Sequence, residues 1–522
     1  MRIARRVIVG LALIVTVLVL IRGLILTTYD PPTSDAYLWG AFHVHSTLSD
    51  GLGSFEEIAS QARSARVAFL LMSDHGSPHT AAADSRTVDG VRFVGGSEVS
   101  LPEGRLIVSA AQWLPRYTLP SYPPAAARDV REWGGMAVLA YPDDPRYRWS
   151  YWEDDFLPDG IEIINLASYL RAGSVWRVLT WVGFSMFNRH YFVSSLESPE
   201  YALSRWDELL TRSDVVGFYA SNAHGGFRLG DSVDVPFPSY RTALGFVGLG
   251  IEPHYRDQPE RAIRTGDFFS VVRGAGEPER FEFERASDGR IRVSVKAAEE
   301  LSARVVLKRD GRIVAETRDG GLVHQPGRGV YRAEVYLEAH PLLAGDVPWI
   351  LSNPIRVDVA YPVLSPDVLP CTQRRALALD EFRVETDTDS NASIELAPSG
   401  PLTLWYDLAQ ATPESPERWV ALALRRSLDL SASKGVYIDA RAPEPMRYQL
   451  DLRTPDTEYR ASVVIREGGR VTVPWEQFYS LAGARGLAPS ADVEALLIEV
   501  TDSTSRTGFE STLSLEGVGL CR

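Results

Sequence analysis

The chain opens with an apolar run that is long enough to cross a membrane. Residues 7–26 are almost wholly apolar, with Arg22 near the outer end, and about 20 such residues span a bilayer as a helix. Three arginines precede the run and Asp30 and Asp35 follow it, a bias that places the N-terminus in the cytoplasm. We therefore expect residues 1–35 to be an uncleaved membrane anchor and linker, with the body of the protein in the periplasm or extracellular space. A cleavable signal peptide is the alternative, although no clear Ala-x-Ala site follows.

The next stretch, residues 36–279, contains short apolar runs that lead into polar motifs. Val67–Met72 and Gly160–Asn165 are two such runs. We interpret these runs as strands, and Ser54–Ala59 as a helix that follows the first loop. The polar motifs therefore lie where strands end.

Beyond residue 280 the pattern changes to short segments in which apolar and polar residues alternate. Phe281–Glu284 and Ile291–Val295 are examples, and glycine turns separate them. A repeat of about ten residues of this kind predicts a small β-sandwich over residues 280–361. We assign no chemistry to it.

Residues 362–522 form a second region of predicted strands, among them Tyr448–Leu452 and Leu496–Val500. This region resembles a galactose-binding-like β jelly roll, similar to some carbohydrate-binding modules, so a glycan is a candidate partner. Trp405, Trp419 and Trp475 would stack on sugar rings in that case. The alternative, which we expect, is that they belong to the core.

One segment of the first region is unusually aromatic. Val175–Val193 carries two tryptophans together with three phenylalanines and one tyrosine. A helix here either rests on the membrane surface near the anchor or packs against the rest of the fold. The pattern alone leaves both alternatives open.

Composition narrows the class of protein. A length of 522 residues with 45% hydrophobic content predicts three globular units with proper cores. The net charge of −14 argues against nonspecific nucleic-acid binding.

The two cysteines, Cys371 and Cys521, lie near the ends of the last region. In an exported protein they are expected to form a disulfide, and two unrelated thiols are the alternative.

Histidines and acids collect at the predicted strand ends. Four of the nine histidines lie there beside acids or amides, in the motifs His43-Val44-His45, Ser73-Asp74-His75 and Asn222-Ala223-His224. The two histidines of His43-Val44-His45 would share one face of a strand, because strand side chains alternate. Imidazole and carboxylate groups gathered at strand ends are typical of a metal site. The candidate ligands are His43, His45, Asp50, His75, Glu98, Asn222 and His224.

The order of these motifs resembles the PHP family, named for bacterial DNA polymerases and histidinol phosphatases. The resemblance extends from about Tyr37 to about Gly276. It implies an α/β fold, a distorted seven-stranded (β/α)7 TIM-like barrel with up to three metal ions at its mouth, here followed by the two all-β domains. Six of the nine family ligand positions match. Arg105, Tyr141 and Asn222 replace two histidines and an aspartate.

By the same resemblance, one ion is held by His43, His45, Glu98 and Asn222. A second ion site is lost because Arg105 and Tyr141 stand at its positions. The third uses Asp50, His75 and His224. The resemblance thus implies one or two divalent ions, with Zn, Mn, Mg or Fe as candidates.

Two further residues are candidates for a direct catalytic role. Arg105 is able to grip a phosphate where the second ion is lost; the alternative is a rim residue paired with an acid such as Glu103. Asp74 either takes part directly or orients a neighbouring histidine or loop. Tyr141 hydrogen-bonds substrate or fills the space that a ligand left.

These features predict an exported, membrane-anchored, metal-dependent hydrolase of phosphorylated small molecules. The alternative is a degenerate PHP domain that binds metal, an anion or a glycan at the cell envelope without catalysis. The replaced ligands favour the alternative, whereas the two coherent retained clusters favour the enzyme.

Overall fold

The computed structural model describes most of the chain beyond residue 28. It covers residues 29–522 apart from 77–84, 110–118, 186–187, 230–232, 236, 299–300, 361–370, 372, 399, 411, 413–417, 466–467, 481–491 and 502–507, and also residues 10, 13–14 and 16–17. The predicted anchor helix over residues 7–26 therefore lies largely outside the described residues. No helix within the described ranges is long and apolar enough to span a membrane.

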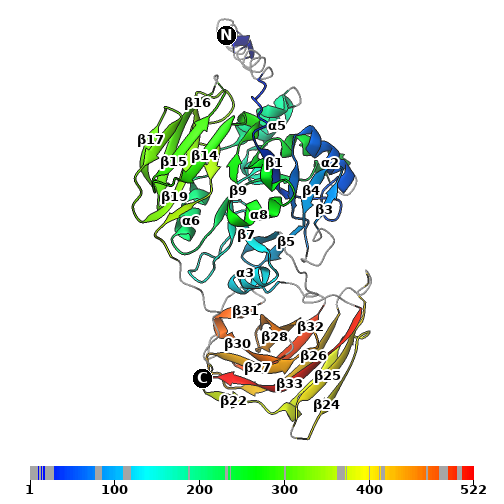
Figure 1. The fold of residues 1–522 in the computed structure, drawn as a ribbon. Helices are drawn as coiled ribbons and strands as arrows, with labels where there is room; N and C mark the ends of the chain where they lie inside the picture. The colour runs from blue at the N-terminus through cyan, green and yellow to red at the C-terminus, as the bar shows by residue number, and fades with distance from the viewer. Residues whose placement is uncertain are drawn as a thin grey trace, which may run out of the picture. The chain divides into compact units, whose positions relative to one another are not determined.

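The described chain forms two compact units (Figure 1). The first takes residues from Met1–Gly76, Ala81–Ala111 and Gly135–Tyr361, and the second from Ser77–Thr80, Gln112–Gly134 and Pro362–Arg522. The internal stretch Gln112–Gly134, with helix α3 (Pro123–Glu132), thus belongs with the C-terminal residues. Within the second unit, Arg447 forms an ion pair of 2.9 Å with Asp129 of α3, and both side chains are buried.

A mixed sheet of buried apolar strands is the centre of the first unit, as the α/β prediction requires. β2, β1, β9, β8 and β7 follow one another in parallel pairs, and β6 and β5 continue the sheet in antiparallel pairs. Their bounds are β1 Leu38–Val44, β2 Phe69–Met72, β5 Gly96–Leu101, β6 Gly104–Ser109, β7 Met136–Ala140, β8 Gly160–Asn165 and β9 Val216–Ala223.

The two ends of this seven-strand path meet next to the candidate ligands. Glu98 of β5 donates its backbone N–H to the carbonyl of Asp74 (3.0 Å), and Gly76 donates to the carbonyl of Glu98 (3.2 Å). The contact is a single parallel bridge between His75 and Glu98 and not a continuous ladder. The predicted seven-stranded barrel therefore stays a prediction, while the mixed α/β character is clear.

Helices pack against these strands through small and aromatic side chains. The capping box of Ser54 and Glu57 begins α2, where the sequence predicted a helix. Trp206 of α6 lies against Gly217 of β9, where a Cβ would come within 2.9 Å of the indole ring. The helices of this unit are α2 Phe55–Ser64, α4 Leu166–Ala172, α5 Val175–Ser185, α6 Glu200–Leu210, α7 Tyr240–Leu244, α8 Pro259–Thr265, η2 Arg189–Ser195, η3 Pro253–Tyr255 and η4 Arg273–Ala275.

The strands predicted between residues 280 and 361 are present, and they belong to the same unit. β14, β15 and β18 form a small sheet, while β20 pairs with β13 and so extends the central sheet toward β19, β16 and β17. β15 buries alternate residues, as its sequence pattern predicts. The remaining strands of the unit are β3 Arg86–Val88, β4 Val91–Val94, β10 Phe227–Leu229, β11 Val233–Val235, β12 Gly248–Ile251, β13 Phe269–Val271, β14 Arg280–Arg285, β15 Ile291–Lys296, β16 Ser302–Arg309, β17 Arg312–Thr317, β18 Gly321–His324, β19 Gly329–Glu338, β20 Ile350–Ser352 and β21 Ile355–Val357.

In its described part, the second unit is a sandwich of two antiparallel sheets around one apolar core. Trp475 belongs to that core, as expected, and Trp419 packs at the edge of a smaller apolar cluster. Trp405 is 55% exposed, so the expectation of a core position is wrong for it. The elements are β22 Arg374–Ala376, η5 Leu379–Glu381, β23 Arg383–Thr386, β24 Asn391–Leu396, β25 Leu402–Leu408, β26 Trp419–Leu428, β27 Gly435–Arg441, β28 Met446–Arg453, β29 Glu458–Ile465, β30 Gly469–Pro474, η6 Trp475–Gln477, β31 Tyr479–Ser480, β32 Val493–Thr501 and β33 Phe509–Cys521.

The predicted disulfide between Cys371 and Cys521 is confirmed. It joins residues separated by 150 positions, and β22 pairs with the end of β33 beside it, with Arg374 opposite Cys521. The bond therefore ties the first and last described strands of the sandwich together.

Removing this crosslink should destabilise the second unit. For a loop of this length the chain-entropy model gives about 5 kcal/mol, and measured values are typically about 2–4 kcal/mol. We expect Cys371→Ser combined with Cys521→Ser to lower the free energy of unfolding of the second unit by about 2–4 kcal/mol, measured by urea unfolding. Adding a reductant should reproduce the loss in the unmodified chain and leave the variant unchanged. An identical midpoint in the two proteins would contradict the prediction.

Candidate metal centre

The first two ligands come from an irregular strand end. The pairing of β1 shifts register between Phe42 and Val44 on both of its sides, and His43 has a left-handed backbone with φ 68°. A β-bulge of this kind re-aims side chains. His43 and His45 do face the same site, as the sequence predicts, although the strand between them is irregular and not a regular alternation.

The loop after β1 is pressed against the strand end by close contacts. Tyr240 donates its hydroxyl to the carbonyl of His45 (2.7 Å) and accepts the N–H of Gly53 (3.2 Å). A Cβ at Gly51 would come within 2.5 Å of the carbonyl oxygen of His45, so only glycine fits there. Gly51 thereby brings its neighbour Asp50 over His45.

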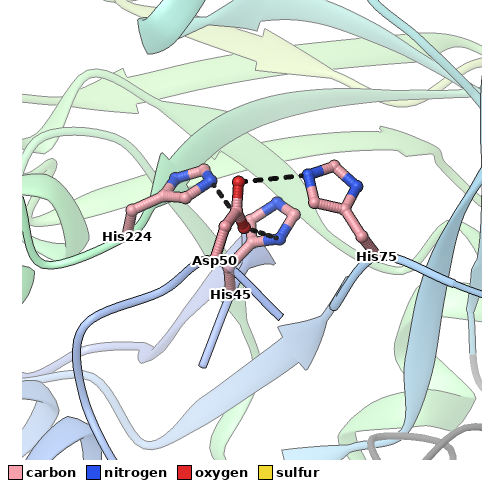
Figure 2. Close-up of side chains that lie close together, drawn as sticks. All are labelled: His45, Asp50, His75 and His224. Atoms are coloured by element: carbon pink, nitrogen blue, oxygen red, sulfur yellow. Dashed lines mark ion pairs between the residues drawn. The ribbon is translucent and has the colours of Figure 1, made fainter. Parts of the chain in front are cut away.

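Asp50 lies at the centre of a first cluster with three histidines (Figure 2). Its Oδ1 is 3.3 Å from His45 Nδ1 and 3.3 Å from His224 Nε2, and its Oδ2 is 3.3 Å from His75 Nε2. The residues come from three separate places in the chain, since His45 and Asp50 belong to one loop. The Asp50 side chain is 54% exposed, whereas His45 is fully buried, so the cluster opens to solvent on the Asp50 side.

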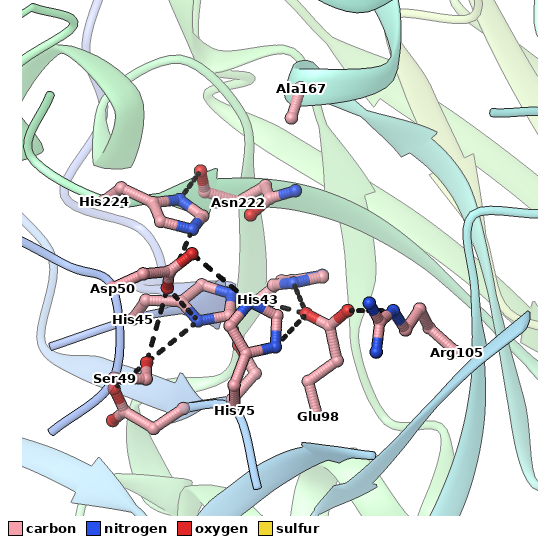
Figure 3. A network of polar contacts seen from close by, with 12 residues as sticks. His43, His45, Ser49, Asp50, His75, Glu98, Arg105, Ala167, Asn222 and His224 are labelled. Carbon is pink, nitrogen blue, oxygen red and sulfur yellow. Dashed lines mark hydrogen bonds and ion pairs between the residues drawn. The ribbon is translucent and has the colours of Figure 1, made fainter. Parts of the chain in front are cut away.

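A second cluster shares His45 with the first (Figure 3). Glu98 Oε2 lies 2.9 Å from His43 Nε2 and 3.4 Å from His45 Nε2. The three side chains are almost completely buried. In each cluster, the potential ligand atoms all lie within 4.8 Å of one another. Sequence reasoning placed His45 in one ion site, whereas the structure puts it in both clusters.

Glu162 is a functional candidate that the sequence analysis did not select. Its Oε1 lies 2.5 Å from His43 Nδ1, and its Oε2 accepts hydrogen bonds from Asn165 Nδ2 (2.8 Å) and the backbone N–H of Tyr141 (2.9 Å). The residue is fully buried on β8. A carboxylate behind a ligating histidine orients the ring and strengthens it as a ligand. The available signal was a charged residue inside the apolar run Gly160–Asn165.

The charges of the cluster shift the pKa values of its members strongly. Burial opposes protonation of His43, but Glu162 and Glu98 outweigh it and raise the pKa of His43 to about 9. Burial and the neighbouring His224 lower the pKa of His45 to about 3. Burial works against ionisation of Glu98, yet its bonds to His43 and His45 hold the pKa of the carboxyl below its usual value. Strongly shifted pKa values within one cluster, some raised and some lowered, are typical of functional sites.

Asn222 carries an acceptor that is available to a cation. Its Nδ2 donates to the Tyr141 hydroxyl (2.8 Å) and to Asn165 Oδ1 (3.1 Å). Its buried Oδ1 has no hydrogen-bond partner among the residues that the structure describes, and a buried acceptor without a partner is costly. Together with the imidazole and carboxylate donors, this free oxygen suits a bound divalent cation, so the residues present fit a metal.

Arg105 faces the second cluster from β6. Its Nε lies 3.7 Å from Glu98 Oε1, and its guanidinium stacks over the ring of Tyr147 with 5.0 Å to the ring centroid. The Arg105 side chain is 22% exposed and therefore reachable. Tyr141 fills the space beside His43, with its hydroxyl 3.4 Å from His43 Nε2. Both residues thus lie where the sequence placed them, next to the retained ligands.

Asp74 contacts the loop that carries the ligands. Its Oδ1 accepts hydrogen bonds from the backbone N–H of Ser46 (2.7 Å) and the hydroxyl of Ser49 (2.7 Å), and its Oδ2 accepts the hydroxyl of Ser46 (2.9 Å). The residue is buried. This geometry matches the orienting alternative, with Asp74 holding the loop from His45 to Asp50 in place.

Three site residues share an uncommon backbone conformation. His43, Tyr141 and Asn222 have φ values of 68°, 54° and 45°. Left-handed backbone at a residue with a Cβ costs about 1–2 kcal/mol. Such conformations cluster at functional sites, where the surrounding structure holds them.

Comparisons with known proteins give weak similarities. No protein-family model and no curated protein matches the chain. Among solved structures, a two-domain protein from Bacteroides vulgatus containing a predicted PHP-like metal-dependent phosphoesterase is 13% identical, covering 62% of this chain and 98% of that one, with a TM-score of 0.30. A family 11 carbohydrate-binding module from Clostridium thermocellum is 9% identical over 28% of this chain and 95% of its own, with a TM-score of 0.23. A family 30 module is 16% identical over 27% and 78%, with a TM-score of 0.19.

Glu162 should control the affinity of the site for metal. Glu162→Gln keeps an acceptor for Tyr141 and Asn165 but removes the negative charge behind His43. Loss of such a partner typically weakens metal binding by about 10- to 100-fold, and we expect this range for Mn²⁺ or Zn²⁺ by isothermal titration. The control is Glu260→Gln, whose carboxylate pairs with Arg92 instead. Equal metal affinity in the two variants would show that Glu162 does not support the metal site.

Asn222 should act in the opposite direction when it gains a charge. Asn222→Asp supplies an anionic oxygen where the neutral Oδ1 has no partner, and added ligand charge raises cation affinity, here by about tenfold. Asn222→Ala should lower it. The measurement is the Mn²⁺ content of protein dialysed against limiting metal. If all three proteins retain the same amount, Asn222 is not a ligand.

Proposed function

We propose that this chain is a metal-dependent phosphoesterase that hydrolyses phosphorylated small molecules. One observation carries the proposal: two groups of imidazole and carboxylate donors share His45 and converge from separate strand ends. Two ions in adjoining sites would be held by His43, His45 and Glu98, with Asn222, and by Asp50, His75 and His224. Mixed nitrogen and oxygen donors suit Zn²⁺, Mn²⁺ or Fe²⁺ better than Mg²⁺, which prefers oxygen.

The metal would supply hydroxide near neutral pH and positive charge against the phosphoryl group. The side chains of the protein position the ligands and bind the phosphate. Glu162 and Asp74 position His43 and the ligand loop through the contacts described above. Arg105 is partly exposed beside Glu98, and its planar fork matches two phosphate oxygens. Its stacking on Tyr147 fixes the plane of the guanidinium before the substrate arrives.

The surrounding charges favour an anionic substrate at this side of the site. Arg171 stacks over both Tyr141 and Tyr147 and is paired with the buried Asp144 at its guanidinium. Arg146 also lies over Tyr147, at 5.2 Å from the ring centroid. Cations arranged around one aromatic ring, next to the cluster of candidate metal ligands, suit a phosphate ester.

The proposed setting is the cell envelope. The apolar run over residues 7–26 would anchor the chain, and the body would act outside the cytoplasm on small phosphorylated molecules, with nucleic acid disfavoured by the net charge of −14. The C-terminal unit would hold the enzyme near a glycan, for which the exposed Trp405 is the candidate contact.

The second candidate is a metal- or anion-binding protein without turnover. It is favoured by Arg105 and Tyr141, which stand at two ligand positions of the resembled family. It needs the same donors and differs only in the chemistry. Elemental analysis of the purified protein together with a panel of phosphate esters separates the two, because metal with turnover supports the enzyme and metal without turnover supports the second candidate.

Arg105 should matter for phosphate and not for metal. We expect Arg105→Ala to lower kcat/KM for phosphate esters by about 10- to 100-fold, the effect of one charge-assisted bidentate contact, with unchanged metal content. The matched control is Arg212→Ala, since that side chain is also 22% exposed and pairs with Asp154. Unchanged kcat/KM in Arg105→Ala would mean that Arg105 is a rim residue that does not bind the phosphate.

A further inference from the structure

Helix α5 presents an apolar face that the described structure leaves uncovered. Val175, Trp176 and Leu179 are 72%, 78% and 55% exposed. Residues at these spacings lie on one side of a helix. Isolated exposed apolar residues are common, but three large ones on one face mark an interaction surface. These three residues are the apolar face of α5.

The opposite side of α5 is held firmly by the first unit. Trp181 is buried, and a Cβ on Gly173 would come within 2.7 Å of its indole ring. Arg177 stacks over the same ring at 5.0 Å from its centroid and forms an ion pair with Glu197. The helix therefore packs on the first unit through Trp181 and Ser185, and the apolar face lies on its outer side.

Tyr29, where the continuous described chain begins, lies next to the end of this helix. Asn188 lies three residues beyond the end of α5 at Ser185. Its backbone N–H donates to the carbonyl of Phe184 (3.0 Å). The Asn188 side chain donates to the carbonyl of Tyr29 (2.7 Å), and the Tyr29 hydroxyl donates to the carbonyl of Ala275 (2.6 Å). Figure 1 shows α5 beside the point where the blue N-terminal chain joins the unit.

These contacts limit how far the apolar run can be from α5. Residue 26 ends the run three positions before Tyr29, and three residues span at most about 11 Å. α5 has 11 residues, which makes it about 16 Å long. A bilayer that holds residues 7–26 would therefore begin within about 11 Å of Tyr29, which contacts the chain just beyond the C-terminal end of α5.

We propose that the apolar face of α5 rests on the surface of a lipid bilayer, the same bilayer that receives residues 7–26. Trp176 and its aliphatic neighbours have the chemistry of an interfacial helix, with an amphipathic ring at headgroup depth. The contact would hold the body in one orientation on the membrane. The proposal depends on the predicted anchor and is independent of the phosphoesterase activity.

A label at Leu179 tests the contact directly in the full chain. The structure contains no free cysteine among its described residues, so Leu179→Cys supplies one thiol for an environment-sensitive NBD dye. Val323→Cys on β18 is the matched control, because Val323 is also 55% exposed. Both labelled proteins are reconstituted in vesicles of phosphatidylcholine and phosphatidylglycerol, with and without lipids brominated near the headgroup.

The expected result is blue-shifted emission at position 179 and an about twofold or greater loss of that emission with brominated lipid, and neither effect at position 323. Two results overturn the proposal. Emission at 179 that matches the control means that the face stays in water. A blue shift without bromine quenching means that protein covers it, either residues 7–26 of the same chain or another copy. Phosphate-ester turnover measured on the same samples tests the proposed enzyme separately, since neither label lies in the metal centre.

Discussion

Two buried carboxylates, Glu98 and Glu162, bracket the buried ring of His43, and the site depends on this contact. Glu98 lies 2.9 Å from one ring nitrogen and Glu162 lies 2.5 Å from the other. Removing charges from water is costly unless each has a close partner. An imidazole between two acids provides that partner, as its raised pKa shows. A bound cation on the Glu98 side would keep the charge balanced while Glu162 holds the ring.

The backbone is shaped to maintain this arrangement. β1 carries a bulge at His43, and left-handed residues follow β7 and interrupt β9 at Tyr141 and Asn222. Each departure from regular geometry has a cost that only the surrounding contacts can offset. The hydrogen bonds from Tyr141 and Asn165 to Glu162 are such contacts, so the carboxylate that orients His43 also holds the irregular backbone. Strand irregularity and ligand placement are thus one structural feature.

The predicted candidates and the observed clusters agree to the extent that local pattern allows. His45, His75 and His224 each follow an apolar run, and the structure gathers them around Asp50. Glu162 was missed because a single acid within an apolar strand has no spacing pattern that distinguishes a ligand partner from an ion pair. The position of Trp405 was also mistaken, since alternation along β25 depends on which face the sandwich buries. Likewise, the grouping of Gln112–Gly134 with the C-terminal unit follows from contacts between distant residues, such as Asp129 with Arg447, which are 318 positions apart.

The sequence by itself determined the kinds of elements and the chemistry available to them. Apolar runs ending in His and Asp motifs marked the strand ends, alternation marked the later β-strands, and two cysteines in an otherwise cysteine-free chain indicated the disulfide. Only the tertiary structure decided that His45 belongs to both clusters, that Glu162 supports His43, and that one face of α5 stays exposed. The reason is physical: local patterns record which side chains avoid water, whereas distances between charges depend on how the strands are paired and bent.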